Sequence, residues 1–185
     1  MIANIGVMPN YLRPRRPGAT IYFEVCLQDP QSTLLTDEID QLRSAVGLTR
    51  RTRPFHVDAW VVLPDQMHAI WTLPEGDFDY PTRWRQIKSR FSRELPRAPR
   101  TASQLARRER GIWQRRYWEH HIASQSDYRT HMEICRTLPT RRGLCDHPAD
   151  WPYSSFHRQA VGCVLARTVP SPHELKAWDG RPNHH

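Results

Sequence analysis

The chain has little lysine, no closely paired cysteines and no long apolar run, and each shortage excludes a class of protein. No stretch of its 185 residues reaches the ~18 consecutive apolar residues of a membrane span. No basic segment followed by an apolar one opens the sequence, so a secretory signal is not expected. The four cysteines form no Cys-x-x-Cys pair, which favours reduced thiols in the cytoplasm over a zinc knuckle or a disulfide framework.

The basic residues are almost all arginine. The chain has 27 basic and 19 acidic residues, a net charge of +8, and Lys88 and Lys176 are its only lysines. Guanidinium groups grip phosphate bidentately and stack on bases, so this composition favours a nucleic-acid partner, although an arginine-rich genome has the same effect. The charge is concentrated in residues 83–116, the basic segment, which holds 12 basic and 2 acidic residues. Its interleaved aromatics are typical of single-strand binding, but helical spacing places Trp84 and Phe91 in the core.

Apolar periodicity predicts one α+β domain at residues 19–158. A basic, proline-interrupted arm at 1–18 precedes it, and an irregular proline-rich tail at 159–185 follows it. Strands are expected at 20–27, 55–63, 67–73 and 112–122. Helices are expected at 37–48, from 81 to about 95, and at 127–137, where Pro139 ends the last one.

Five segments carry a more specific signal: AWVVLPDQMHAIWTLPEG, RWRQIKSRFSREL, IWQRRYWEHHI, DYRTHMEI and DWPYSSFHR. In this order they resemble the REP-associated tyrosine transposases, IS200-like single-tyrosine HUH endonucleases, over most of Gly18 to Arg158. The resemblance implies a ferredoxin-like antiparallel sheet with helices packed on one face. It also implies binding to hairpins in single-stranded DNA, which the family cuts. The family is often dimeric, which leaves a homodimer open, and neither a membrane nor a small-molecule substrate is expected.

Three positions depart from the family's cleavage chemistry. The family holds Mg²⁺ or Mn²⁺ with a His-x-His motif, whose alternate residues share one face of a strand, and here the motif is Gln66-Met67-His68. The resemblance places the nucleophilic tyrosine at Ile134 and a third metal ligand at Leu138. The amide oxygen of Gln66 is a weak replacement ligand, but Ile134 has no hydroxyl and Leu138 has no donor atom. Impaired cleavage and metal binding are therefore predicted.

Other side chains are poor replacements for the missing groups. Tyr128 lies six residues before Ile134, so it faces another side of the helix. Tyr117 lies in an expected strand, and Tyr153 belongs to a structural motif of the tail. Glu119 and His120, on the strand expected to neighbour His68, are its candidate partners.

DNA binding does not require the tyrosine. The residues expected to contact phosphate are Arg13, Arg15, Arg16, Arg83, Arg85, Lys88, Arg90, Arg115 and Arg116. By resemblance, the arm from Tyr11 to Arg16 reads bases next to the hairpin. The sequence therefore predicts a transposase-family protein that binds single-stranded or hairpin DNA, with impaired cleavage. The alternatives are an active metal-dependent endonuclease with a substitute nucleophile, and a non-catalytic factor that binds structured RNA.

Overall fold

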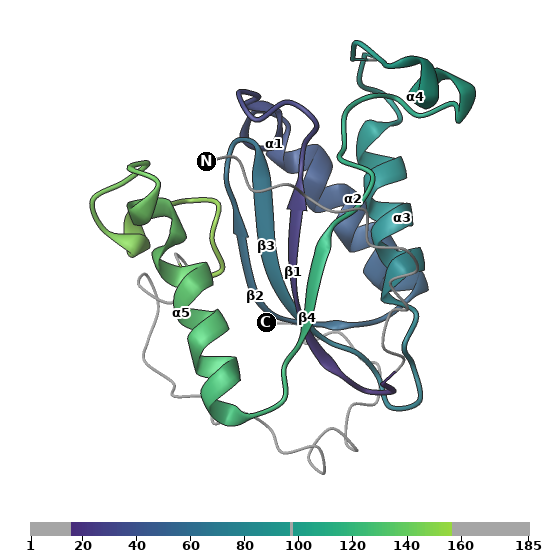
Figure 1. The fold of residues 1–185 in the computed structure, drawn as a ribbon. Coiled ribbons are helices and arrows are strands. Elements are labelled where there is room, and N and C mark those ends of the chain that lie inside the picture. The colour runs from purple at the N-terminus through teal and green to yellow at the C-terminus, as the bar shows by residue number, and fades with distance from the viewer. Residues whose placement is uncertain (1–15, 97, 157–185) are drawn as a thin grey trace, which may run out of the picture.

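The computed structural model describes residues 16–96 and 98–156. Most of the expected arm and the whole expected tail lie outside these residues. No described helix is long and apolar enough to cross a membrane. The elements, in chain order (Figure 1), are β1 (Thr20–Cys26), α1 (Leu34–Asp37), α2 (Ile39–Thr52), β2 (His56–Val62), β3 (Gln66–Thr72), α3 (Tyr80–Ser92), α4 (Ala102–Ala106), β4 (Trp118–His121), α5 (Gln125–Arg141) and a 3₁₀ turn, η1 (Pro148–Asp150).

The four strands form one antiparallel sheet in the order β2-β3-β1-β4. The two central strands are β3 and β1, where Glu24 pairs with His68. On its other side β1 pairs with β4, where Tyr22 lies opposite His120. The α+β class and the antiparallel sheet expected from the sequence are confirmed.

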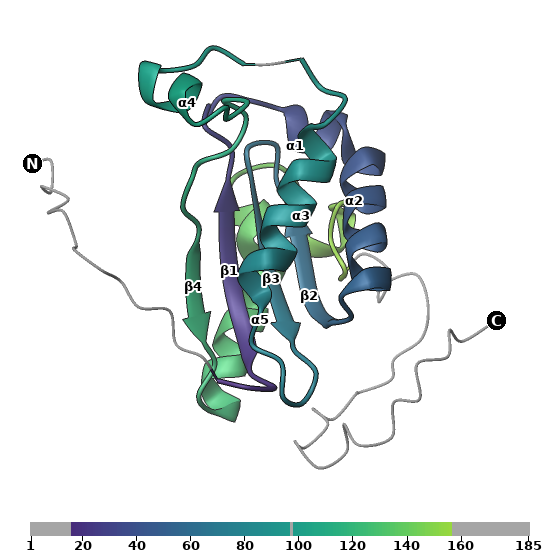
Figure 2. The same ribbon diagram turned by 90° about the vertical axis from the view of Figure 1, so that its right-hand side faces the viewer.

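The helices lie on both faces of the sheet, where the sequence predicted one. In Figures 1 and 2, α2 and α3 cover one face and α5 covers the other. Alternation along β1 explains this arrangement, since successive side chains of a strand point to opposite faces. Ile21, Phe23 and Val25 join the core under α2 and α3. Tyr22 joins a second, smaller cluster under α5.

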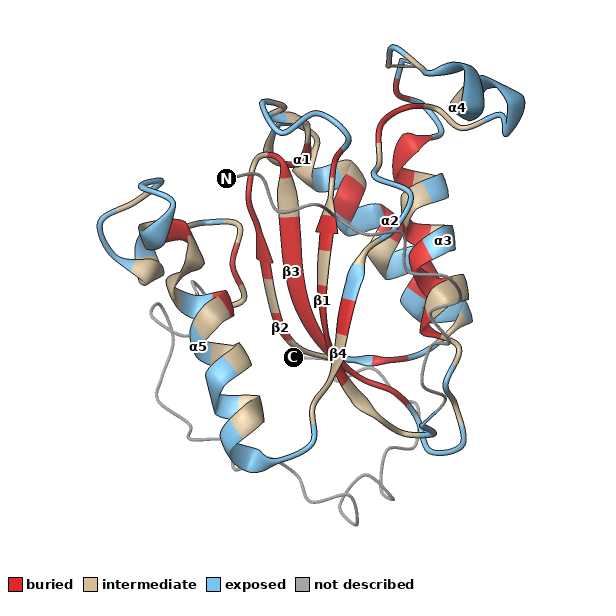
Figure 3. Ribbon diagram, in the orientation of Figure 1, coloured by how far each residue is buried: buried red, intermediate tan, exposed pale blue. Residues whose placement is uncertain are grey.

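Aromatic rings fill the larger core. Trp71 of β3 stacks on Trp84 of α3 with ring centroids 4.2 Å apart, and Phe23 packs against both rings. Trp84 and Phe91 are buried, as their helical spacing predicted. Figure 3 shows the resulting buried stripe along α3, facing the buried strands.

Three element boundaries differ from the predictions. The expected helix at 37–48 is α1 followed by α2, with Glu38 between them. The expected strand at 112–122 is regular only over β4, and an isolated bridge joins Leu27 to Trp113 upstream. Pro139 is inside α5. The helix continues beyond it because the N–H of Arg142 bonds to the carbonyl of Leu138, and one missing donor near a helix end is tolerated.

Candidate functional site

His68 lies on β3, on the sheet face that α5 covers, and is almost fully buried. Its Nδ1 lies 2.5 Å from the Tyr22 hydroxyl and its Nε2 lies 2.9 Å from the Gln66 Nε2. Both ring nitrogens are therefore engaged by neighbouring side chains. Burial, with a smaller contribution from Arg142, lowers the pKa of His68 to about 4. The imidazole is thus neutral at pH 7.

Ile134 and Leu138 make an apolar contact on the same face of the sheet. Both pack from α5 against the smaller cluster, which includes Val61, Leu63 and Ile70. The two positions that the resemblance assigned to a nucleophile and a metal ligand therefore attach α5 to the sheet. Aliphatic side chains stabilise this contact through burial, whereas a hydroxyl or an amide there would need a polar partner.

The residues that the resemblance assigned to the family's metal site do not fit a divalent cation. The imidazole of His68 is the only strong ligand of the three, and both of its nitrogens are already hydrogen-bonded. Gln66 offers a neutral amide oxygen, and Leu138 offers only methyl groups. Hard cations require several oxygen ligands, so no catalytic step is assigned to a metal at this position.

Tyr22 is the tyrosine that the structure brings to His68, and sequence reasoning did not consider it. Tyr22 and His68 are 46 residues apart in the sequence, and they meet because β1 pairs with β3. Burial raises the pKa of Tyr22, and a buried phenol with a raised pKa is a poor nucleophile. Tyr128, considered earlier, donates a hydrogen bond to Asp58 at 3.3 Å and also has a pKa raised by burial. Tyr128 and Ile134 both pack against the smaller cluster, so the prediction that Tyr128 faces another side of the helix is wrong.

The predicted roles of Glu119 and His120 beside His68 need correction. Glu119 pairs with Phe23, whose side chain joins the core under α2 and α3, so Glu119 faces the side of the sheet opposite His68. His120 shares the face of His68, but it pairs with Tyr22, which stands between them.

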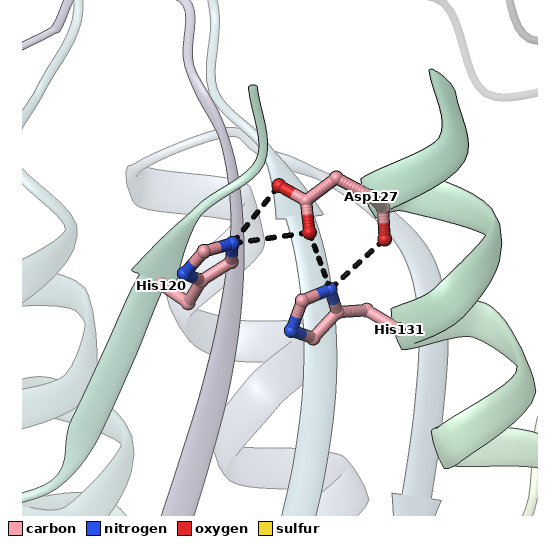
Figure 4. A group of neighbouring side chains, drawn as sticks. All are labelled: His120, Asp127 and His131. Atoms are coloured by element: carbon pink, nitrogen blue, oxygen red, sulfur yellow. Dashed lines mark hydrogen bonds and ion pairs between the residues drawn. The ribbon is translucent and has the colours of Figure 1, made fainter. Parts of the chain in front are cut away.

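His120 instead meets two residues of α5, as Figure 4 shows. Its Nε2 lies 2.9 Å from an oxygen of Asp127, and the Nδ1 of His131 lies 3.0 Å from the other oxygen. The hydrogen bond from the Ala123 N–H lowers the pKa of Asp127, and the hydrogen bond with His120 makes the next largest contribution. Among the described residues, these three side chains form a His/Asp cluster close enough to hold a metal ion.

Arg83 is not available to DNA, contrary to the prediction. Its side chain is 1% exposed and its guanidinium pairs with Asp77 at 2.6 Å. Arg90 is partly buried and bonds to Thr49 of α2, so it lies against the neighbouring helix. Arg13 and Arg15 lie outside the described residues, and Arg16 is exposed at the start of the described chain.

Three of the remaining predicted basic residues line a surface cavity of about 390 Å³. The cavity lies between the first half of α3 and the segment that leads into β4. Its lining includes Arg85, Lys88 and Arg115, with Trp84 and Tyr117. Trp84 is 1% exposed, whereas Tyr117 is partly exposed. The ammonium of Lys88 lies 5.4 Å from the centroid of the Tyr117 ring. Arg116 is exposed in the same segment. We name this surface the basic cavity.

Comparison with known proteins identifies relatives over most of the chain. No family model matches it. A REP-associated tyrosine transposase of Escherichia coli (strain K12) is 42% identical over 154 residues, covering 83% of this chain and 86% of the relative. A relative from Haemophilus influenzae is 38% identical over 178 residues, covering 95% of this chain and 96% of its own.

A solved structure has the same fold. It is described as a REP-associated tyrosine transposase bound to a REP hairpin, and it superposes with a TM-score of 0.72 at 42% identity. The match covers 83% of this chain and 86% of that structure. With the sequence relatives, this similarity means that the chain belongs to the family of REP-associated tyrosine transposases.

Proposed function

We propose that this chain binds a REP-like hairpin in single-stranded DNA and does not cleave it by the family's tyrosine chemistry. The observation that carries the binding proposal is the basic cavity. Arg85, Lys88 and Arg115 supply positive charge there, and the partly exposed Tyr117 lies in its wall. The description of the DNA-bound relative supports a hairpin as the ligand.

The chemistry of the basic cavity suits a folded single strand. Guanidinium groups bind phosphate oxygens bidentately, and aromatic rings support unpaired bases in many single-strand sites. The side chains of Arg85 and Arg115 are exposed, so both reach the solvent that a DNA strand would displace. Arg116, Arg16 and the arm residues Arg13 and Arg15 remain proposed phosphate contacts. The arm (1–18), the domain (19–158) and the tail (159–185) remain the proposed organisation.

The cleavage proposal rests on side-chain chemistry. A phosphotyrosine cannot form at Ile134, and Leu138 cannot ligate a metal. Hairpin binding is therefore expected to proceed without Mg²⁺ or Mn²⁺, the cations implied for the family's cleavage site. The buried Tyr22 and Tyr128, both with raised pKa values, are not expected to replace the nucleophile.

Fluorescence anisotropy tests the binding proposal. A labelled hairpin with a 5′ single-stranded extension is titrated with protein in EDTA at several salt concentrations. We expect tighter binding than to an unstructured strand of equal length. Replacing Arg85 and Arg115 together by alanine should flatten the plot of log affinity against log salt by about 1.5, since each phosphate contact contributes roughly 0.7–0.9. Arg43→Ala, which removes an exposed arginine paired with Asp40 on α2, is the matched control.

Two results would overturn the binding proposal. Equal affinity for the hairpin and the unstructured strand would remove the hairpin specificity. Stronger competition by an RNA hairpin of the same sequence than by the DNA hairpin would favour a structured-RNA factor, because RNA presents 2′-hydroxyls and A-form geometry.

A nicking assay tests the cleavage proposal separately. The wild-type chain, incubated with the hairpin and Mn²⁺, should give neither nicked DNA nor a covalent protein–DNA adduct. A triple variant with Gln66→His, Ile134→Tyr and Leu138→Asn should recover nicking. A covalent adduct on any tyrosine of the wild-type chain would show an active endonuclease with a substitute nucleophile.

A further inference from the structure

The cluster of His120, Asp127 and His131 joins the edge of the sheet to the first turns of α5. His120 comes from β4, and the other two residues lie four positions apart on α5. One ligating atom from each residue lies within 4.8 Å of the others. The side chains are 37%, 22% and 12% exposed, respectively. Solvent therefore reaches the cluster, while most of each side chain is held by the fold.

Neighbouring groups fix the orientation of all three side chains. The Asp127 carboxylate accepts a hydrogen bond from the Ala123 N–H at 2.9 Å. The rings of His120 and His131 stack with centroids 4.6 Å apart. Trp118 stacks on His120 with centroids 5.8 Å apart, and Tyr22 packs against His131 with centroids 4.6 Å apart. Ligands held by packing and outer hydrogen bonds lose little entropy when an ion binds.

We propose that His120, Asp127 and His131 form a binding site for a borderline divalent transition-metal ion such as Zn²⁺ or Co²⁺. Two imidazoles and one carboxylate are a donor set that such ions accept, whereas Mg²⁺ and Ca²⁺ prefer oxygen ligands alone. Three protein ligands leave a coordination position for water or another exogenous ligand, as in many zinc sites. The set shares no residue with Gln66 and His68.

The observed separations suit this assignment. Ligand atoms about 2.0–2.2 Å from a tetrahedral ion lie about 3.3–3.6 Å from one another. The two His–Asp separations are 2.9 and 3.0 Å, and no pair of ligating atoms exceeds 4.8 Å. Small side-chain rotations therefore bring all three donors to one ion. The ion would replace the contacts of both histidines with the Asp127 carboxylate. It would also replace the hydrogen bond that the His131 Nδ1 donates to the main-chain carbonyl of Asp127 at 2.9 Å, and it would link β4 to α5.

Cobalt titration tests the site in the full, tag-free chain. We expect visible absorption bands that saturate at one Co²⁺ per chain and disappear when Zn²⁺ displaces the cobalt. Zn²⁺ at about 100 times its dissociation constant should raise the melting temperature by about 5–11 °C, since it binds only the folded chain. These measurements need no DNA, so their outcome is independent of hairpin binding.

Two variants and a control distinguish the site from adventitious binding. His131→Ala and Asp127→Asn should lose the saturable cobalt bands and the zinc-dependent rise in melting temperature. Asp127→Asn keeps an acceptor for the Ala123 N–H, and circular dichroism checks that it folds. His147→Ala, which removes an exposed histidine beyond the other end of α5, should behave as wild type. Absence of saturable binding, or equal cobalt titrations of wild type and both variants, would overturn the proposal.

Discussion

Replacing Arg83 by methionine should destabilise the fold without weakening DNA binding. The guanidinium donates to both oxygens of Asp77, at 3.1 and 2.6 Å. It also donates to the main-chain carbonyls of Arg53, Pro54 and Asp79, at 3.2, 2.7 and 3.1 Å. Methionine would fill much of the same space with an apolar side chain, but it would leave the Asp77 carboxylate and the three carbonyls without the guanidinium as a hydrogen-bond donor.

The expected loss is about 3 kcal/mol. Removing one partner of a buried ion pair costs roughly 3–5 kcal/mol, and the lower end applies because the Asp77 side chain is 30% exposed. At roughly 2–4 °C per kcal/mol for a chain of this size, the melting temperature should fall by about 6–12 °C. Arg83 lowers the pKa of Asp77, so the stabilisation by this pair is present above the ordinary carboxyl pKa and is lost as pH falls through the lowered one.

Thermal unfolding followed by circular dichroism measures this loss, and anisotropy below the transition measures hairpin affinity. Arg85→Met is the control, since it removes an exposed charge from the same helix. Arg83→Met should lower the melting temperature and leave hairpin affinity unchanged. Arg85→Met should leave the melting temperature unchanged and weaken hairpin affinity. An Arg83 variant with normal stability and weakened DNA binding would refute the structural role and restore the role predicted from the sequence.

Three further perturbations test other parts of the fold. Burial depresses the pKa of His68 to about 4, so as the pH falls this histidine is protonated in the unfolded chain before it is protonated in the folded one. The free energy of unfolding should therefore fall by at most about 3 kcal/mol between pH 6.5 and 4. Urea unfolding across this range should show a smaller loss for His68→Gln. Ile134→Ala should cost about 2 kcal/mol in urea, because it removes part of the apolar contact of α5. Gly111→Ala should lower the melting temperature more than Gly76→Ala, although both glycines have positive φ. A Cβ at Gly111 would lie 2.7 Å from the Pro99 carbonyl oxygen, whereas a Cβ at Gly76 would have no neighbouring atom within 4 Å.

Each of these predictions has a contrary outcome. Identical pH profiles for wild type and His68→Gln would mean that His68 is not held neutral by the fold. An Ile134→Ala variant as stable as wild type would mean that α5 does not depend on this contact. Equal losses for the two glycine variants would mean that the loop at Gly111 adapts to a methyl group.

The sequence predicted the elements whose pattern is local. The spacing of Trp84, Ile87 and Phe91 predicted a helix with one buried face, and these side chains are buried in α3. The same spacing contained the signal for Arg83, which lies three residues after the buried Tyr80 and four before Ile87. Its charge suggested exposure because the partner that neutralises it, Asp77, lies in the preceding loop.

Contacts between distant segments were beyond local patterns. Tyr22 and His68 are 46 residues apart in the sequence but in contact in the fold, and this contact depends on the register of β1 against β3. His120 meets Asp127 and His131 because α5 returns across the second face of the sheet, whereas the prediction put every helix on one face. Nothing in the spacing of these histidines specifies that return. The departures from the family pattern at Gln66, Ile134 and Leu138 were inferred from the sequence. The apolar packing of Ile134 and Leu138 and the contact of Gln66 with His68 required the structure.

The sheet separates two sets of positions that mutation can change independently. Along β1, Tyr22 faces α5 and Phe23 faces α3, so adjacent residues of the strand belong to opposite faces of the sheet. The basic cavity is on the α3 side, and Ile134 packs on the α5 side. Selection for tighter hairpin capture and selection for restored strand scission would therefore enrich separate groups of residues. A lineage of this fold can change one property while the other is inherited intact.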